Sequence, residues 1–231
     1  MAIQEDLIAE LDGIFPKAWD EQATESIPDP EDVRLNNHAK HLGQATVLYA
    51  DLNGSTKMVD NFIWWFSAEI YKAYLRCAAR IIVLNGGRIT AYDGDRIMAI
   101  YTGESKNTSA VRSALCINWA VTELIRPAIL QQYPSSKFEL NHSIGIDSSE
   151  LRASRIGVRG NNDLVWIGRA ANHAAKLTSV PGAPIWITKH VHDKINDAVK
   201  FHEGTSMWKR WHWTSMENAE IYSSTYIWRG E

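Results

Sequence analysis

Cysteine is scarce in this sequence. Among its 231 residues only Cys77 and Cys116 carry thiols, and both fall in stretches with a helical pattern. Two thiols placed in this way argue against a disulfide scaffold and against a zinc site, which needs closely spaced cysteines or histidines. We therefore expect both to be reduced thiols of the core.

Long apolar runs and an excess of one charge are missing too. No stretch approaches the roughly 18 apolar residues that cross a membrane, and residues 1–6 lack the basic segment of a signal peptide. The net charge of −3 gives no electrostatic reason to expect a nucleic-acid partner. The eight histidines show no metal-site spacing. We expect a cytoplasmic protein that binds neither membrane nor nucleic acid.

The chain is long enough for one domain with a core and an appendage. Residues 1–43 differ from the rest, because apolar residues at helical spacing give way to prolines among acids. This pattern predicts a short amphipathic helix and an irregular linker, so we expect an N-terminal helical arm over 1–43 and the main domain over 44–231. The helix should pack on its own domain or on a dimer partner; another protein is the alternative. The apolar residues are Ile3, Leu7, Ile8, Leu11 and Phe15, and the prolines are Pro16, Pro28 and Pro30.

One stretch, residues 47–56, looks like a strand that ends in a turn. The apolar run stops at Asp51, and a glycine then opens the turn. Ser55 and Thr56 can cap the helix that we expect over Met58–Leu84. A carboxylate at a strand end beside the N–H groups of a helix start suits a metal ion with a bound phosphate. The alternative is that Asp51 only caps the strand end.

A second stretch predicts a hairpin. Residues 88–92 and 96–101 read as strands around the tight turn Asp93-Gly94-Asp95. If this hairpin pairs beside the first strand, Asp95 approaches Asp51. Two close carboxylates repel unless a cation lies between them, so this pairing implies a divalent metal. The alternative is a turn whose acids face solvent.

The remaining pattern predicts alternating helices and strands. Asn172 and Lys176 are four residues apart in the expected helix Gly168–Leu177, so they share one face that could hold a sugar oxygen and a phosphate. An exposed polar face is the alternative. The arginines of a hairpin and two cations of the tail could contact phosphate or simply be solvated: Arg152, Arg155, Arg159, Lys209 and Arg210. Other expected elements are a helix over Asn107–Gln131 that Pro127 kinks or ends, and strands over Phe138–Asp147, Leu164–Ile167 and Ile185–Ile187.

Three segments resemble motifs of the class III nucleotidyl cyclases. They are residues 49–56, the Gly94-Asp95 turn and residues 167–177, in the family's order. The resemblance implies an α+β fold, namely a ferredoxin-like catalytic domain with a mixed or antiparallel sheet and flanking helices. It further implies a homodimer whose active sites are shared across the interface.

The resemblance also implies a reaction, in which a nucleoside triphosphate becomes a 3′,5′-cyclic monophosphate and pyrophosphate. Asp51 and Asp95 would hold two Mn²⁺ or Mg²⁺ ions, with the Leu52 carbonyl as a further ligand. Asn172 would reach in from the other subunit to position the ribose, and Lys176 stands where the family usually has arginine. The phosphates would lie on the backbone of Asn53, Gly54, Ser55 and Thr56.

The positions that read purines in the family are apolar here, namely Ala91 and Val165. In this respect the sequence is similar to the stand-alone pyrimidine cyclases of bacterial Pycsar antiphage systems, which make cUMP or cCMP for a separate effector protein. The polar neighbours are Tyr49, Tyr92 and Arg96, and an arginine or tyrosine donor suits the carbonyls of uracil. We expect UTP to be preferred over CTP. A cytidylate cyclase, a purine cyclase and an inactive nucleotide-binding module are the alternatives.

Overall fold

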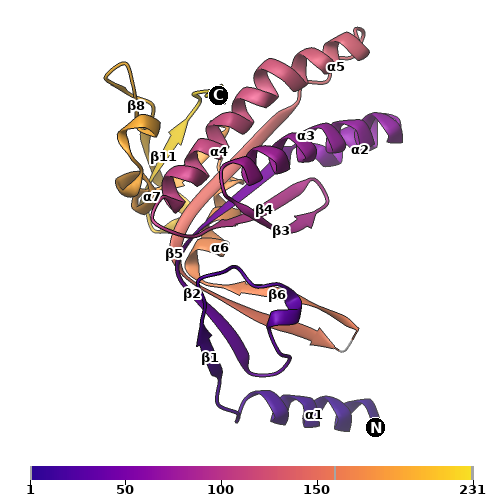
Figure 1. Cartoon of the computed structure of the whole chain (residues 1–231). Helices are drawn as coiled ribbons and strands as arrows, with labels where there is room; N and C mark the ends of the chain where they lie inside the picture. Colours follow the sequence, from indigo (N-terminus) through magenta and orange to yellow (C-terminus); the bar gives the residue numbers. More distant parts are fainter. Residues whose placement is uncertain (1, 159, 230–231) are drawn as a thin grey trace.

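The structure, a computed structural model, describes residues 2–158 and 160–229 (Figure 1). Its helices are α1 (Ala2–Ile14), α2 (Ser55–Asn61), α3 (Trp64–Leu84), α4 (Lys106–Ala120), α5 (Arg126–Gln132), α6 (Arg169–Leu177) and α7 (Lys189–Lys194). Its strands are β1 (Asp20–Ala23), β2 (His38–Asn53), β3 (Arg88–Asp93), β4 (Arg96–Tyr101), β5 (Asn141–Val158), β6 (Asn161–Ile167), β7 (Ile185–Thr188), β8 (Phe201–His202), β9 (Thr205–Ser206), β10 (Lys209–Trp213) and β11 (Ala219–Ser224). None of the helices in these ranges is both long and apolar enough to cross a membrane.

One mixed sheet organises the chain. Within the described residues it has nine strands, in the order β10-β11-β7-β5-β2-β4-β3, with β1 paired to β2 and β6 paired to β5. The β5–β7 and β1–β2 pairs are parallel and the others are antiparallel. Helices flank the sheet, which confirms the expected α+β fold (Figure 1). β3 and β4 form the hairpin that the turn residues predicted, and β4 pairs with β2, which meets the condition for Asp95 to approach Asp51.

The side chains of β2 alternate between two core clusters, one on each face of the sheet. Leu48 and Ala50 pack in the large cluster with α3 and α4, whereas Val47 and Tyr49 pack in a second cluster with the alanines of α6. Successive side chains of a strand point to opposite faces. Asp51 therefore continues the series of Val47 and Tyr49, on the sheet face that α6 covers.

The expected helix Met58–Leu84 is divided in two, so that prediction was wrong in its first turns. Gly54, at φ 76°, is the N-cap of α2. Ser55 and Thr56 therefore lie inside the helix and do not cap it. Phe62 is extended and ends α2. Its ring stacks on Phe66, with the centroids 4.6 Å apart. It also meets the ring of Phe138 edge to face, with the centroids 5.6 Å apart, and this long-range contact explains why helical periodicity did not show the break.

The second long helix is continuous in direction but changes type. A π-helical turn over Val121–Ile125 joins α4 to α5, and Pro127 lies in the first turn of α5. Proline has no N–H to donate, and it is accommodated here because the helix widens just before it, where the Arg126 N–H donates to the Val121 carbonyl. The expected kink is therefore a π turn before Pro127. The strand expected over Phe138–Asp147 begins later and is much longer, because β5 continues into a hairpin with β6.

The N-terminal arm contains the predicted helix, but the linker is not irregular throughout. β1 pairs in parallel with β2, with Asp20 opposite His38, and β2 crosses residue 43 without a break. The prediction missed β1 because all its side chains are exposed and show no apolar alternation. The helix does not pack on its own domain either, since the apolar side chains of α1 are exposed. The division of the chain at residue 43 stays a prediction.

Candidate active site

The centre of the candidate site is an ion pair between two neighbouring strands. Ala50 of β2 pairs with Ile97 of β4, which sets Asp51 opposite Arg96. The Arg96 Nη2 atom donates to Asp51 Oδ2 over 2.9 Å. This hydrogen bond raises the pKa of Arg96 above its usual value. Asp51 thus already has a cation of the chain beside it.

Asp95 lies one residue before Arg96, at the end of the turn that Gly94 closes with φ 60°. Its Oδ2 atom is buried and has no hydrogen-bond partner among the described residues. The hydroxyl of Tyr74, on α3, is buried and unpartnered in the same way. Burial raises the pKa of Tyr74 well above its usual value, and the charges of Asp51 and Asp95 add to the effect. The charges of both carboxylates thus act on this hydroxyl, and Arg96 connects the two acids, since it follows Asp95 directly and bonds to Asp51.

This arrangement fits a divalent cation. A buried carboxylate oxygen without a hydrogen-bond partner indicates a site for an additional ligand. Mg²⁺ and Mn²⁺ prefer carboxylate oxygens. In the described part of the chain, no group of three or more histidines, cysteines and acids is placed to hold a metal. Asp51 and Asp95 would thus need further oxygen ligands, from the backbone or from a bound phosphate.

The segment after Asp51 forms the predicted turn. Leu52 and Asn53 still pair with β5, opposite His142 and Asn141. Gly54 adopts the left-handed conformation and α2 follows at once, so the first N–H groups of α2 have no partner within the helix. The residues expected to contact phosphate lie around this helix start: Asn53, Gly54, Ser55 and Thr56.

Three of the predicted base-contact residues lie around Asp51. The guanidinium carbon of Arg96 is 5.9 Å from the centroid of the Tyr49 ring, and Ala91 packs in the same apolar cluster as Tyr49. Burial raises the pKa of Tyr49. Tyr92 is exposed. Val165 lies on β6 opposite Ser154, away from this group in the sheet order.

The predicted residues of α6 face solvent. Ala170, Ala171 and Ala174 pack against the sheet, whereas Asn172 and Lys176 are exposed. The Lys176 Nζ atom lies 3.8 Å from the sulfur of Met216. Within the described residues, no hydrogen bond or ion pair joins Asn172 or Lys176 to the two carboxylates. One chain therefore presents the two halves of the predicted site separately.

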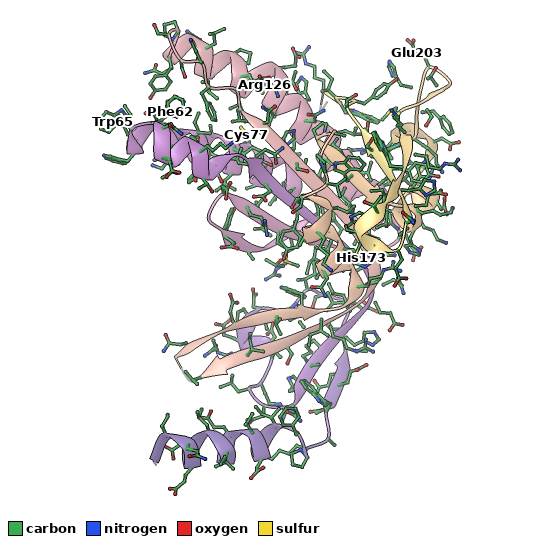
Figure 2. The ribbon with its side chains drawn as sticks, turned by 180° about the vertical axis from the view of Figure 1, so that it is seen from behind. Phe62, Trp65, Cys77, Arg126, His173 and Glu203 are labelled. Atoms are coloured by element: carbon green, nitrogen blue, oxygen red, sulfur yellow. The ribbon has the colours of Figure 1, made fainter. Side chains whose placement is uncertain are left out.

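Sequence reasoning missed the group that holds α6 in place. Asp147 of β5 is completely buried and pairs with two side chains of α6: Arg169 Nε lies 3.0 Å and His173 Nδ1 lies 3.4 Å from its Oδ2. Thr188 donates to the other oxygen over 2.6 Å. Burial lowers the pKa of His173, which Figure 2 labels. An aspartate that follows the apolar residues 144–146 was the available signal.

The other predicted cations have protein partners. Arg152 pairs with Glu21 over 2.8 Å, and Arg155 donates to Asn162 over 2.6 Å. Arg159 lies outside the described residues. In the tail, the Lys209 ammonium is 4.6 Å from the centroid of Trp211, and Arg210 is 3.9 Å from Glu220.

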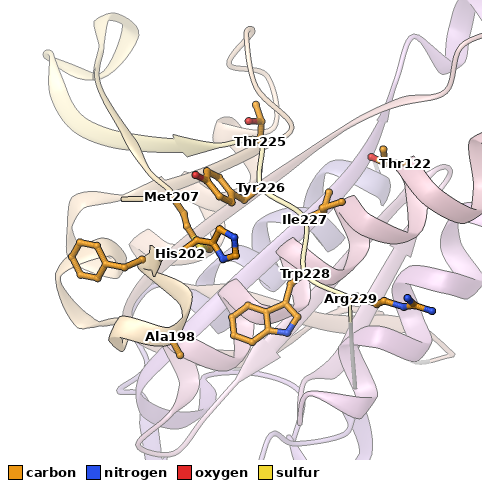
Figure 3. Close-up of a pocket in the computed structure, with 10 residues that line it drawn as sticks. Thr122, Ala198, His202, Met207, Thr225, Tyr226, Ile227, Trp228 and Arg229 are labelled. Carbon is orange, nitrogen blue, oxygen red and sulfur yellow. The ribbon is translucent and has the colours of Figure 1, made fainter. Parts of the chain in front are cut away.

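Two cavities of the described chain lie away from Asp51 and Asp95. A cavity of about 760 Å³ opens between the C-terminal segment and the β8–β9 hairpin (Figure 3). It is lined chiefly by His202, Met207, Tyr226 and Trp228. A second cavity, of about 460 Å³, is bordered by Lys176 and by the tail residues Trp211 and Met216.

Comparison with known proteins identifies the fold and the family. No protein-family model matches the sequence. The adenylyl cyclase CyaB from P. aeruginosa has a similar fold, with a TM-score of 0.65 at 19% identity over 80% of this chain and 95% of its own. The fold is thus that of a class III cyclase catalytic domain. A uridylate cyclase of Burkholderia cepacia is 55% identical, and one of Xanthomonas perforans is 48% identical, each over 99% of both chains. The chain belongs to this uridylate cyclase family, whose members are nucleotidyl cyclases.

Proposed function

We propose that this chain, as a homodimer in the cytoplasm, converts UTP to 3′,5′-cyclic UMP and pyrophosphate. The observation that carries the proposal is the buried, unpartnered oxygen of Asp95, whose neighbour in the chain, Arg96, is hydrogen-bonded to Asp51. The names of the full-length relatives support uridine as the base. In this proposal cUMP is a second messenger of antiphage defence that acts on a separate effector protein.

The carboxylates of Asp51 and Asp95 would hold two Mn²⁺ or Mg²⁺ ions, with the Leu52 carbonyl as a further ligand. Bound there, the metal would acidify the ribose 3′-hydroxyl and neutralise the triphosphate. The unpaired N–H groups at the start of α2 would bind phosphate oxygens.

The second half of each site would come from the other protomer. Asn172 is exposed on α6 with an amide free to hold a ribose oxygen, and fixing the ribose gives the in-line geometry that such a displacement needs. Lys176, on the same face, would neutralise phosphate charge. Among the described residues no hydrogen bond or ion pair joins this face to the carboxylates of the same chain, which supports a site completed by a second copy.

The uracil would be read at Arg96. Its Nη2 atom is engaged by Asp51, but its Nε atom is buried without a hydrogen-bond partner among the described residues. A carbonyl oxygen of uracil would satisfy this donor. Tyr49 supplies an aromatic surface beside it, and Ala91 offers no group that would hydrogen bond a purine.

The direct test is turnover of UTP, CTP, ATP and GTP with Mn²⁺ under one set of conditions, with products identified by mass spectrometry. We expect cUMP as the main product. A better yield from CTP would overturn the uracil assignment, and a better yield from a purine would overturn the pyrimidine assignment. Absence of any cyclic product from a folded, metal-loaded dimer would mean a nucleotide-binding module. The Asp95→Asn protein, prepared identically, shows whether a contaminating cyclase contributes.

A further inference from the structure

The N-terminal helix has an apolar stripe that is left exposed by the described residues of its own chain. The stripe residues and the aromatic side chain that follows are between 48% and 81% exposed: Ile3, Leu7, Ile8, Leu11, Ile14 and Phe15. A lone helix of this length is marginal in water, and most helical stability in proteins comes from packing of an apolar face. The stripe therefore implies a partner surface.

The connection to β2 keeps α1 away from the rest of its chain. The Asn37 amide donates to the carbonyls of Ile14 and Lys17 over 2.7 and 2.8 Å, which fixes the end of α1. The following strand β1 is paired with β2. The helix consequently lies at one end of the molecule, far from α2 and α3 at the other end (Figure 1).

A second exposed apolar surface lies at that other end. Val59 of α2, then Ile63, Trp64 and Trp65 at the start of α3, are between 47% and 75% exposed. The two indole rings meet edge to face, with centroids 5.8 Å apart. We call these four residues the tryptophan patch. Figure 2 shows Trp65 at the tip of α3, on the same side of the molecule as the free end of α1.

The charges around the two surfaces are complementary. Helix α1 carries Glu5, Asp6, Glu10 and Asp12 and no basic residue in its sequence. At helical spacing these acids flank the apolar stripe on both sides. The exposed charged side chains of α2 and α3, the helices that carry the tryptophan patch, are four cations and two acids, so this surface is net positive: Lys57, Lys72, Arg76, Arg80, Asp60 and Glu69.

We infer that α1 of one copy docks on the tryptophan patch of a second copy of this chain. The two surfaces project to one side from opposite ends, so a twofold rotation that exchanges the ends brings each α1 onto the other copy's patch. The inference rests on the homodimer of the proposed function and adds an interface to it. Because α2 starts at the predicted phosphate turn, the docked α1 would hold the helix that follows that turn.

A photo-cross-link tests the contact in the full-length chain. Leu11 is replaced by the photoreactive benzoylphenylalanine, and the protein is mixed with a ¹⁵N-labelled copy, irradiated and digested. We expect cross-links between light and heavy chains that fall within residues 55–76. The matched control places the same group at Ala9, on the opposite face of α1, and should give none. Leu11 cross-links that stay within one chain, or that fall elsewhere on the second copy, would overturn the inference.

Dimer affinity separates this inference from the proposed function. The Leu7→Asp/Leu11→Asp variant should raise the dimer dissociation constant at least tenfold in sedimentation equilibrium, as should Trp65→Asp, whereas Ala9→Asp should not. None of these side chains is buried in its own chain, so the melting of the monomer should not change. An unchanged dissociation constant for the Leu7/Leu11 variant overturns the docking alone. A wild-type monomer overturns both the docking and the shared site. A docked dimer without cyclase activity overturns only the proposed function.

Discussion

Arg96 holds Asp51 through a hydrogen bond of 2.9 Å, so a side chain of the protein occupies one oxygen of a carboxylate that we assign to metal. A cation at this position repels a metal ion, yet the Nε atom of Arg96, one of its remaining donors, is buried and unpaired. The two roles of Arg96, as a counterion of Asp51 and as a donor to the base, make different predictions.

We expect Arg96→Ala to raise the KM for UTP by roughly tenfold to a hundredfold, because an unpaired uracil carbonyl costs about 1–3 kcal/mol. The same change should lower the Mn²⁺ concentration for half-maximal rate, since Asp51 loses its competing cation. Titrations of UTP and of Mn²⁺ measure the two effects separately. Arg96→Lys, which keeps the charge but loses Nε, should weaken UTP binding and leave the metal dependence nearly unchanged. A normal KM for UTP in both variants would remove Arg96 from base recognition.

The Asp51→Asn and Asp95→Asn variants should each lose cyclase activity with little change in melting temperature. Each removes a charged metal ligand. The lost ion pair of Asp51 is partly exposed and worth no more than about 1 kcal/mol, and the Asp95 Oδ2 atom has no partner to lose. Turnover and thermal melting measure both.

Asp93→Asn is the matched control, because Asp93 lies in the same turn and is exposed. It should retain most of the activity. Substantial turnover by either the Asp51 or the Asp95 variant would remove that residue from the mechanism.

Mixed dimers test whether a site is shared. Homodimers of Asp95→Asn and of Asn172→Ala should both be inactive. A heterodimer of the two would have one doubly damaged site and one intact site, so co-expression should recover part of the wild-type rate. Two differently tagged chains allow the heterodimer to be purified and assayed. An inactive heterodimer would show that Asp95 and Asn172 do not act in opposite chains.

The sequence predicted those parts of the site that depend on local patterns. The apolar run that ends at Asp51 predicted β2, the Asp93-Gly94-Asp95 turn predicted the hairpin, and Gly168 marked the start of α6. What it did not predict depends on contacts between distant segments. The end of α2 at Phe62 follows from aromatic packing on α3 and on Phe138.

The contacts of Asp147 also could not be predicted from the sequence. Arg169 and His173 reach it only because α6 packs across β5, and the approach of helix and strand is close at Gly145, where an added Cβ would lie 2.1 Å from the Ala174 carbonyl oxygen. Neither spacing nor composition indicates which buried acid a helix will meet. The anchoring of α6, which carries Asn172, on Asp147 through Arg169 and His173 therefore became apparent only in the structure.

We expect Asp147→Asn to lower kcat by roughly tenfold to a hundredfold with little change in KM. The asparagine keeps the size of the side chain and an acceptor for Thr188 but loses the charge that attracts Arg169 and His173. A small displacement of α6 would misplace Asn172, and misplacement by about 1 Å can cost such a factor. Steady-state kinetics measures the split. Arg169→Lys, which retains the charge that pairs with Asp147, should lower kcat less than Asp147→Asn does. An unchanged kcat for Asp147→Asn would show that the Asp147 contacts serve stability alone.

His142 should make the protein less stable in acid. It is buried beside Tyr74, and burial, helped by the charge of Arg126, lowers its pKa to about 3. The unfolded chain binds this proton with a pKa of about 6.5. The stabilising effect of the neutral ring is therefore complete above pH 6.5 or so and declines as the pH falls toward 3, by up to about 1.4 kcal/mol per pH unit.

Between pH 6 and pH 4 the wild type should thus lose about 2 kcal/mol of unfolding free energy more than His142→Gln, which has no proton to bind. Urea denaturation at a series of pH values measures both curves. The comparison must be made between variants, because burial also lowers the pKa of other histidines, including His38 and His173. A substitution of the exposed His190 is the control and should follow the wild type. Parallel curves for wild type and His142→Gln would show that this ring takes up its proton without unfolding the chain.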